Sequence, residues 1–340
     1  MKPKLRILLT GASGAVGHEV LRKLILQKEL IDITVFDFKS THSQKILSPC
    51  KNDARVIFGD ITKYDDVRKV AAGVDVVIHL AALIPPLADD LPEQAFQVNT
   101  RGTENLVRNL EQHSPDAFFL YSSSISVYGD RVENPLIKVG DNLTPSEGDY
   151  YATTKIKAEQ IIAESRLKWS IFRLTAIMGQ HKISKLMFHM PLVTPLEICT
   201  MEDAGRAFVM AIEKRDLLTG KIFNLGGGKN CRTTYKDFLD RSFGIMGLGR
   251  CDFPVKAFAD KNFHCGLYED GDDLDAILHF RRNSLNDYFG ELKKSVPPWR
   301  KIITSVFKKQ VKYYLLKKSE PFQAYIKGDA RMIGHYFRTN

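Results

Sequence analysis

Short apolar runs alternate with amphipathic stretches through the first half of the chain. The run at 74–80 is apolar almost without interruption, which is typical of a parallel strand buried on both faces. The other runs predicted to be strands lie at 5–10, 33–36, 55–58, 117–121 and 170–174. Stretches with helical periodicity separate them, at 18–28, 64–72, 93–112 and 151–167. This alternation predicts an α/β fold built on a doubly wound parallel sheet, followed by a smaller C-terminal substrate lobe.

A glycine-rich turn joins the first predicted strand to the first predicted helix. Residues 10–17 read Thr-Gly-Ala-Ser-Gly-Ala-Val-Gly. Glycines at such a turn let the backbone approach a phosphate, and the N-terminus of the following helix attracts the anion. Asp37 ends the second strand, where a carboxylate can accept hydrogen bonds from ribose hydroxyls and repel a 2′-phosphate. The pattern therefore favours NAD as cofactor, while Lys39 nearby leaves NADP open.

A tyrosine and a lysine stand four residues apart at Tyr151 and Lys155, at the start of a predicted helix. This spacing places them on one helix face, where the ammonium is expected to lower the pKa of the phenol. A phenol tuned in this way is a general acid or base, and a serine can hold the substrate oxygen beside it. Tyr313 and Lys317 share the spacing, but no serine-bearing strand precedes them. The serines at 122–124 distinguish the first pair.

Several polar residues near the strand ends have two interpretations. Asp60 suits a hydrogen bond to an adenine amino group, and a turn or helix cap is its alternative role. Asn99 can steady the backbone beneath the active site or lie on the surface. His79 is either a catalytic group or, as we expect, a histidine packed at the end of a strand. The loop at 85–92 is a candidate rim of the substrate site.

The charge of the chain is concentrated at its C-terminus. Residues 291–340 hold twelve Lys/Arg and three Asp/Glu, whereas residues 1–290 balance at 37 of each sign. The net charge of +9 therefore belongs to a basic helical tail and is no argument for nucleic-acid binding. The five cysteines are odd in number and form no Cys-x-x-Cys pair, so we expect a cytoplasmic protein without a metal site.

The segment 299–318 holds seven Lys/Arg and no acidic residue. Its apolar residues fall near one helical stripe. A basic amphipathic helix can lie on an anionic membrane or dock an acidic carrier protein. The simpler interpretation is a terminal helix that packs its stripe on the body and leaves its lysines in water.

Taken together, these motifs resemble the extended short-chain dehydrogenases, a family that includes NAD-dependent epimerases, dehydratases and ketoreductases. The motifs that carry the resemblance extend over roughly residues 4–245. They are the glycine turn, Asp37, Gly-Asp-Ile at 59–61, His-Leu-Ala-Ala at 79–82, Val-Asn-x-x-Gly-Thr at 98–103, Ser-Ser-Ser-x-x-Val-Tyr-Gly at 122–129, Tyr-x-x-x-Lys at 151–155, Met-Glu-Asp-Ala-Gly-Arg-Ala at 201–207 and Gly-Lys-Ile-Phe-Asn-Leu-Gly-Gly-Gly at 220–228.

The resemblance implies a role for each matching residue. Tyr151 would be the general acid/base, Lys155 its pKa tuner and a ribose ligand, and Ser124 the group that orients the substrate oxygen. The residues meeting the pyrophosphate and ribose would be Gly11, Ser13, Gly14, Ala15 and Val16. Those holding the adenosine would be Asp37, Asp60 and Ile61. The path to the nicotinamide would be lined by Leu80, Ala81, Ala82 and Asn99. The resemblance also implies a homodimer.

Departures from the family pattern narrow the substrate. Ser-Ile-Ser at 124–126 replaces the Thr-Asp-Glu of sugar dehydratases, and Ala176 stands where epimerases usually place an asparagine. Only 22 residues, 180–201, separate Gly179 from Glu202, and many are apolar. These features favour a small or apolar substrate, free or tethered to a carrier, as in the ketoreductase and hydroxysteroid-dehydrogenase members.

Three functions follow as hypotheses. The first is an NAD(P)-dependent oxidoreductase that interconverts a secondary alcohol and a ketone. The second is a nucleotide-sugar epimerase that works by transient oxidation, and the third is a cofactor-sensing scaffold that acts through its basic tail. We expect a cofactor-binding domain at 1–180, a substrate lobe at 181–290 interleaved with returning sheet elements, and the tail at 291–340.

Overall fold

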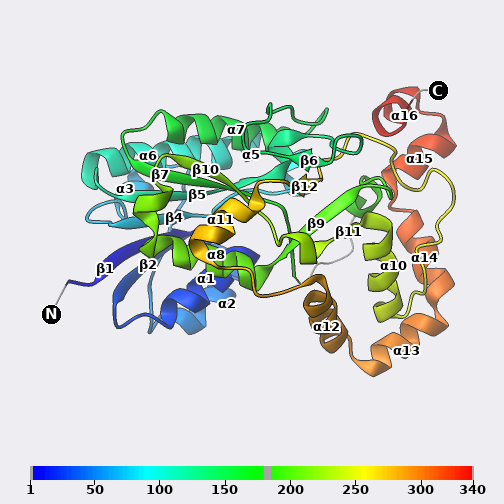
Figure 1. The fold of residues 1–340 in the computed structure, drawn as a ribbon, viewed down its shortest axis with the longest axis horizontal. Helices are drawn as coiled ribbons and strands as arrows, with labels where there is room; N and C mark the ends of the chain where they lie inside the picture. The colour runs from blue at the N-terminus through cyan, green and yellow to red at the C-terminus, as the bar shows by residue number, and fades with distance from the viewer. Residues whose placement is uncertain (1–2, 180–184, 339–340) are drawn as a thin grey trace.

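A seven-stranded parallel sheet forms the centre of the computed structural model, which describes residues 3–179 and 185–338 (Figure 1). Its strand order is β10-β7-β5-β4-β1-β2-β3. The strands are β1 (Leu5–Thr10), β2 (Ile31–Asp37), β3 (Arg55–Phe58), β4 (Val76–His79), β5 (Phe118–Ser124), β7 (Lys168–Leu174) and β10 (Lys221–Leu225). The order reverses direction at β1, so the predicted doubly wound α/β fold is confirmed.

Helices cover both faces of this sheet (Figure 1). The helices on one face are α1 (Ala15–Ile25), α2 (Thr41–Leu47), α8 (Met201–Glu213) and α11 (Gly271–Leu278). Those on the other face are α3 (Tyr64–Arg68), α6 (Gly102–His113) and α7 (Tyr150–Ala163). Each face buries its own apolar cluster, because a sheet covered on both sides must be apolar on both.

The helix predicted at 93–112 is interrupted. It consists of α5 (Pro92–Phe96), a π-helical turn (Gln97–Arg101) and α6. Such turns are rare and frequently mark functional sites. This one carries Asn99. Two strand ends also differ from prediction, since β2 begins at Ile31 and β5 continues through the serines to Ser124.

The C-terminal lobe lies to one side of the sheet (Figure 1). Its elements are β8 (Ala176–Met178), β9 (Pro195–Thr200), β11 (Arg232–Thr234), α10 (Tyr235–Met246), α12 (Leu285–Ser295), α13 (Pro298–Val306) and α14 (Lys308–Leu316). Leu315 of α14 and Phe243 of α10 belong to one apolar cluster. The expected boundary between the lobe (181–290) and the tail (291–340) therefore passes through one packed apolar cluster. Residues 180–184 of the predicted substrate segment lie outside the described residues.

The remaining α-helices and strands are short. They are α4 (Leu87–Asp90), α9 (Arg215–Leu218), α15 (Glu320–Lys327), α16 (Ala330–Tyr336), and the paired strands β6 (Leu136–Ile137) and β12 (Leu267–Tyr268). Within the described part of the chain, no helix combines the length and the apolar character that crossing a bilayer requires.

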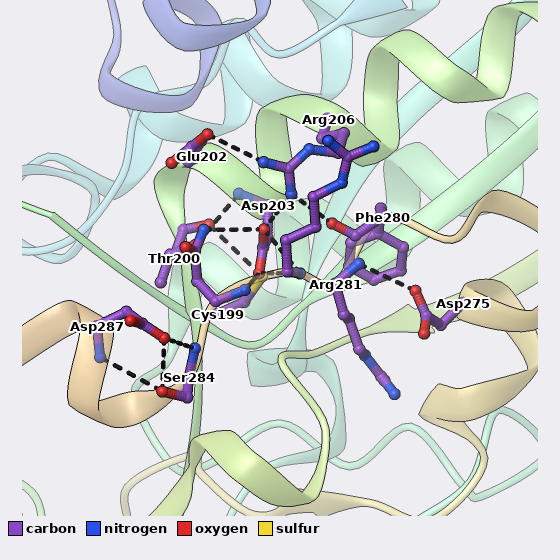
Figure 2. Close-up of polar contacts among 12 residues, drawn as sticks. Cys199, Thr200, Glu202, Asp203, Arg206, Asp275, Phe280, Arg281, Ser284 and Asp287 are labelled. Atoms are coloured by element: carbon purple, nitrogen blue, oxygen red, sulfur yellow. Dashed lines mark hydrogen bonds and ion pairs between the residues drawn. The ribbon is translucent and has the colours of Figure 1, made fainter.

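A buried carboxylate fastens the lobe to the start of α8 (Figure 2). Thr200 caps this helix by accepting from the Asp203 amide at 3.2 Å. The Asp203 carboxylate, fully buried, pairs with Arg206 and accepts from the backbone amides of Arg282 and Asn283 at 3.0–3.2 Å. The motif at 201–207 therefore fixes the segment that leads into α12, because an unpaired carboxylate at this depth would be costly.

A pair of helical glycines offers a matched stability test. A Cβ at Gly17 in α1 would collide with the Gly11 carbonyl oxygen, whereas one at Gly290 in α12 would meet nothing within 4 Å. We expect Gly17→Ala to destabilise the fold by about 1–3 kcal/mol through overpacking. Gly290→Ala should stabilise it by about 0.5–1 kcal/mol, because alanine loses less backbone entropy in a helix. Urea unfolding of both variants checks this, and equal effects would show that Gly17 is not packed against the turn.

Candidate active site

The glycine turn packs directly against the end of β4. Gly11 has φ +73°, and a Cβ there would lie 2.5 Å from the Ala81 nitrogen, so only glycine fits. Gly14 and Ala15 at the start of α1 are exposed. The turn leaves open backbone at a helix N-terminus, which is the arrangement that accommodates an anionic group.

Asp37 holds this turn from the end of β2. Its carboxylate accepts from the Ser13 amide at 2.8 Å and from the Ser13 hydroxyl at 2.9 Å. Burial raises the pKa of Asp37, and the two hydrogen bonds from Ser13 oppose that rise. The Ser13 hydroxyl, expected to meet a pyrophosphate or ribose, is thus engaged with Asp37 in this structure.

The two residues expected to hold an adenine have local packing roles here. The Asp60 carboxylate accepts from the Thr62 amide at 3.0 Å and from its hydroxyl at 2.7 Å, which is the turn interpretation. Ile61 is buried and abuts Gly102, at the beginning of α6. Both lie at the carboxyl end of β3.

Asn99 clamps two elements together. Its amide exchanges two hydrogen bonds with the Leu83 backbone, at 2.7 and 2.9 Å, and donates to the Thr154 hydroxyl of α7 at 3.0 Å. It therefore steadies the backbone that follows β4 and does not lie on the surface. His79 is also fully packed, between the hydroxyls of Thr10 and Thr103 at 2.7 and 2.9 Å. Burial lowers the pKa of His79 to about 3, which keeps it neutral.

Ser124, Tyr151 and Lys155 converge where β5 ends and α7 begins. Asp149 caps α7 by accepting from the Ala152 amide at 2.8 Å. The Lys155 ammonium donates to the Ser122 carbonyl at 2.7 Å and lies 5.7 Å from the centre of the Tyr151 ring. The Ser124 hydroxyl is near enough to the Tyr151 phenol to lower its pKa. The three side chains thus share one small volume, as their sequence positions predict.

The expected lowering of the tyrosine pKa by the lysine is wrong for this structure. Burial raises the pKa of Tyr151, Asp149 raises it further, and only the hydrogen bond with Ser124 opposes them. Burial likewise lowers the pKa of Lys155 to about 7, against the charge of Glu159. Desolvation outweighs the attraction because Lys155 is 2% exposed and its ammonium is bound to a carbonyl.

A buried polar network that no local sequence pattern predicts lies behind these residues. Arg173 pairs with Glu159 at 2.7 Å and donates to the Tyr128 hydroxyl at 2.7 Å. Tyr128 donates to Asn224 of β10 at 2.8 Å, and the Ser123 hydroxyl bonds to Glu159. Burial disfavours the charge of Arg173, but the bonds to Glu159 outweigh it and raise its pKa. The charged Arg173 inside the predicted strand 170–174 was the signal available in the sequence.

One cavity of about 1440 Å³ joins the glycine turn to the C-terminal lobe. Nine predicted site residues line it: Gly11, Gly14, Ala15, Val16, Leu80, Ala82, Ser124, Tyr151 and Lys155. Six lie outside its lining: Ser13, Asp37, Asp60, Ile61, Ala81 and Asn99. Beyond Tyr151 the walls become mostly apolar, with side chains such as Met190, Phe238, Phe243 and Leu292. The site is therefore open toward an apolar chamber.

Several polar side chains line the cavity where the predicted rim at 85–92 lies near the start of α15. Burial raises the pKa of Asp89 to about 6. His264 bonds to Asp149 at 2.8 Å, and His189 to Glu320 at 2.7 Å. The hydrogen bond from His189 helps hold the pKa of Glu320 at about 2. These residues come from separate regions of the chain, and no local motif in the sequence announces them.

A comparison with protein families matches residues 8–169 to the model of the 3-beta hydroxysteroid dehydrogenase/isomerase family. Rat 3 beta-hydroxysteroid dehydrogenase type 7 is 30% identical over 167 residues, covering 48% of this chain and 49% of the relative. The human protein of that name is 32% identical over 170 residues, covering 48% and 45%. The matches thus span about half the length of these curated relatives.

Solved structures extend the likeness to most of the chain. UDP-glucuronic acid 4-epimerase from Bacillus cereus, in complex with UDP-glucuronic acid and NAD, superposes with a TM-score of 0.70 at 19% identity, covering 85% of this chain and 98% of that one. A short-chain dehydrogenase/reductase superfamily protein from Agrobacterium tumefaciens with bound NAD gives 0.64 at 18% identity, covering 90% and 99%. At this identity the likeness concerns the fold.

The buried lysine gives a pH-dependent prediction for stability. Below about pH 7 Lys155 is charged in the folded and the unfolded chain, so its burial costs the full desolvation energy. Between pH 7 and the ordinary lysine value near 10.5, the folded chain binds fewer protons and that cost declines. We expect Lys155→Met to stabilise the protein, with an advantage about 2 kcal/mol smaller at pH 9 than at pH 7.

Urea unfolding of wild type and Lys155→Met at several pH values measures this difference. The contributions of other titrating groups to the free energy of unfolding are the same in both proteins, so they cancel in the difference. A constant difference across the range would contradict a lysine held partly neutral at pH 7.

Proposed function

Since the chain belongs to the extended short-chain dehydrogenase/reductase family by its matched N-terminal half and its fold, we propose that it is an NAD-dependent oxidoreductase interconverting a secondary alcohol and a ketone. One observation carries the proposal. The Ser124, Tyr151 and Lys155 side chains face a single cavity that joins a phosphate-type glycine turn to an apolar chamber. A proton donor is thereby placed between a dinucleotide site and a site for an apolar substrate.

The residues present fit a dinucleotide. Gly11 has no room for a side chain, so the backbone of the turn stays free to approach a diphosphate. The exposed amides at the start of α1 would hold that anion, and Asp37, at the end of β2, would accept from ribose hydroxyls. When bound, NAD supplies or accepts a hydride.

Tyr151 would move the proton. Its pKa is raised by burial, so the phenol is protonated at neutral pH and ready to donate. In the reducing direction it gives its proton to the substrate oxygen while the Ser124 hydroxyl holds that oxygen in place. The phenolate left behind is stabilised by Lys155 in its cationic form. Oxidation of the alcohol runs these steps in reverse.

The chamber favours an apolar substrate over a nucleotide sugar. Ala176 lines the cavity where epimerases usually carry an asparagine, and the surrounding walls include Met178, Met187 and Leu186. Such walls provide few donors for a sugar diphosphate. An epimerase working by transient oxidation would use the same tyrosine, but it would show no net consumption of cofactor.

We assign cofactor binding to residues 1–180 together with the returning β10, and substrate binding to the lobe.

Removing the phenolic hydroxyl tests the mechanism. We expect Tyr151→Phe to lower kcat by about 10²–10⁴-fold, because only the proton transfer is lost. Tyr150→Phe is the matched control, since Tyr150 is 53% exposed and the variant should retain full activity. Stopped-flow measurement of NADH oxidation with cyclic ketones gives the rates. Unchanged turnover in Tyr151→Phe would refute the mechanism, and loss of partner binding alone would favour a scaffold.

Asp37 sets the expected cofactor preference. Its carboxylate should repel the 2′-phosphate of NADPH, so NADH is expected to bind at least about tenfold more tightly. Asp37→Asn keeps an oxygen for Ser13 but removes the charge, and should reduce that preference. Quenching of tryptophan fluorescence during titration with each nucleotide measures both dissociation constants. Tighter binding of NADPH to the wild type would overturn this assignment.

A further inference from the structure

Helix α13 turns its apolar stripe toward solvent. Trp299, Ile302, Ile303 and Val306 recur with helical spacing and form what we call the exposed stripe. These four side chains are 52–68% exposed. None of the residues of α13 is buried. The simpler interpretation of the sequence, a stripe packed on the body, is therefore wrong for this helix.

The opposite side of α13 is the one that faces the protein. The Lys301 carbonyl lies against Gly247, a left-handed residue at the end of α10, and the Ser305 hydroxyl donates to the Gly247 carbonyl at 3.1 Å. Lys301 and Ser305 are one helical turn apart. The helix is thus anchored by its polar side and its backbone, an arrangement opposite to that of an ordinary surface helix.

Phe307 and the neighbouring helix α14 also expose large side chains. Phe307, Tyr313 and Tyr314 are 51–62% exposed, so seven large apolar or aromatic side chains are exposed between residues 299 and 314. Lys312 pairs with Asp252. The other six basic side chains of 299–318 have no acidic partner among the described residues: Arg300, Lys301, Lys308, Lys309, Lys317 and Lys318. The single helix expected over 299–318 is in fact two helices, α13 and α14, with Phe307 between them.

The large cavity extends to the inner side of the same helices. Arg300 and Thr304 of α13 and Val311 of α14 line it, as do Leu292 and Val296 at the end of α12. Arg300 is also exposed, so the apolar chamber reaches the surface beside the exposed stripe.

We propose that α13 and α14 form a docking surface for an anionic lipid bilayer, and that the cavity opens beneath it. Exposed apolar side chains with unpaired lysines and arginines complement the acyl boundary and the negative headgroups of such a surface. Trp299 in the exposed stripe and the exposed Tyr313 and Tyr314 of α14 suit the interfacial region. The docking goes beyond the proposed reaction and stands without it. Entry of a membrane-dissolved substrate through the opening rests on the proposed function.

Vesicle co-sedimentation of the full chain tests the docking. We expect the wild type to pellet with phosphatidylcholine vesicles containing about 30 mol % phosphatidylglycerol, and far less with phosphatidylcholine alone. Ile302→Glu/Val306→Glu should weaken binding by about tenfold or more, because both charges would enter the acyl boundary. Leu26→Glu/Leu217→Glu is the matched control, since these residues are 85% and 56% exposed elsewhere and binding should persist.

Fluorescence locates the contact. Trp169 and Trp299 are the only tryptophans, so Trp169→Phe leaves Trp299 as the sole reporter. Its emission should shift to shorter wavelength with the anionic vesicles. No pelleting, equal pelleting of both charge variants, or binding only to an acidic carrier protein would overturn the proposal. The Tyr151→Phe variant separates membrane docking from the proposed reaction. It should lose turnover and still pellet with the anionic vesicles, because Tyr151 is not part of the docking surface.

Discussion

The buried ion pair between Glu159 and Arg173 is the interaction on which the site depends. Glu159 stands one helical turn beyond Lys155 on α7, and Arg173 comes from β7 beneath it. Removing one partner of such a pair leaves an uncompensated buried charge and typically costs about 3–5 kcal/mol. The pair connects α7 to β7, extends through Tyr128 to Asn224 of β10, and supplies the negative charge that opposes the loss of the Lys155 proton. The ion pair therefore holds the helix that carries Tyr151, and its carboxylate favours the charged form of Lys155.

The two ends of the cavity differ in chemical character. At one end the glycine turn presents open backbone to an anion, and at the other the lobe encloses an apolar chamber. Tyr151 lies between them. Helices α13 and α14 are part of the lobe that forms this chamber. Leu315 of α14 packs into the lobe core, and Arg300 and Thr304 of α13 line the chamber wall. Helix α13 exposes its apolar stripe outward, so the apolar chamber and the outer surface meet at this helix.

Much of this architecture was predictable from sequence. The unbroken apolar runs identified the parallel strands. The glycine turn and the Tyr-x-x-x-Lys spacing singled out residues that line one cavity in the structure, among them Gly11, Tyr151 and Lys155. These are local patterns, so their spacing within one turn, strand or helix is enough to predict them. The missed features depend on distant segments meeting. The network from Glu159 to Asn224 and the polar rim at His189 and Glu320 join residues far apart in sequence. The pKa of Tyr151 was misjudged because burial, which no spacing reveals, outweighs the charge of Lys155.

The most direct test of the account is the fate of the hydride. NADH deuterated at its transferable position would be mixed with the protein and a panel of apolar cyclic ketones, and the products weighed by mass spectrometry. We expect one deuterium on the carbinol carbon of the alcohol and one cofactor oxidised for each product molecule. Interconversion of nucleotide sugars with no net oxidation of NADH, and no reduction of any ketone, would contradict it and identify the site as that of an epimerase.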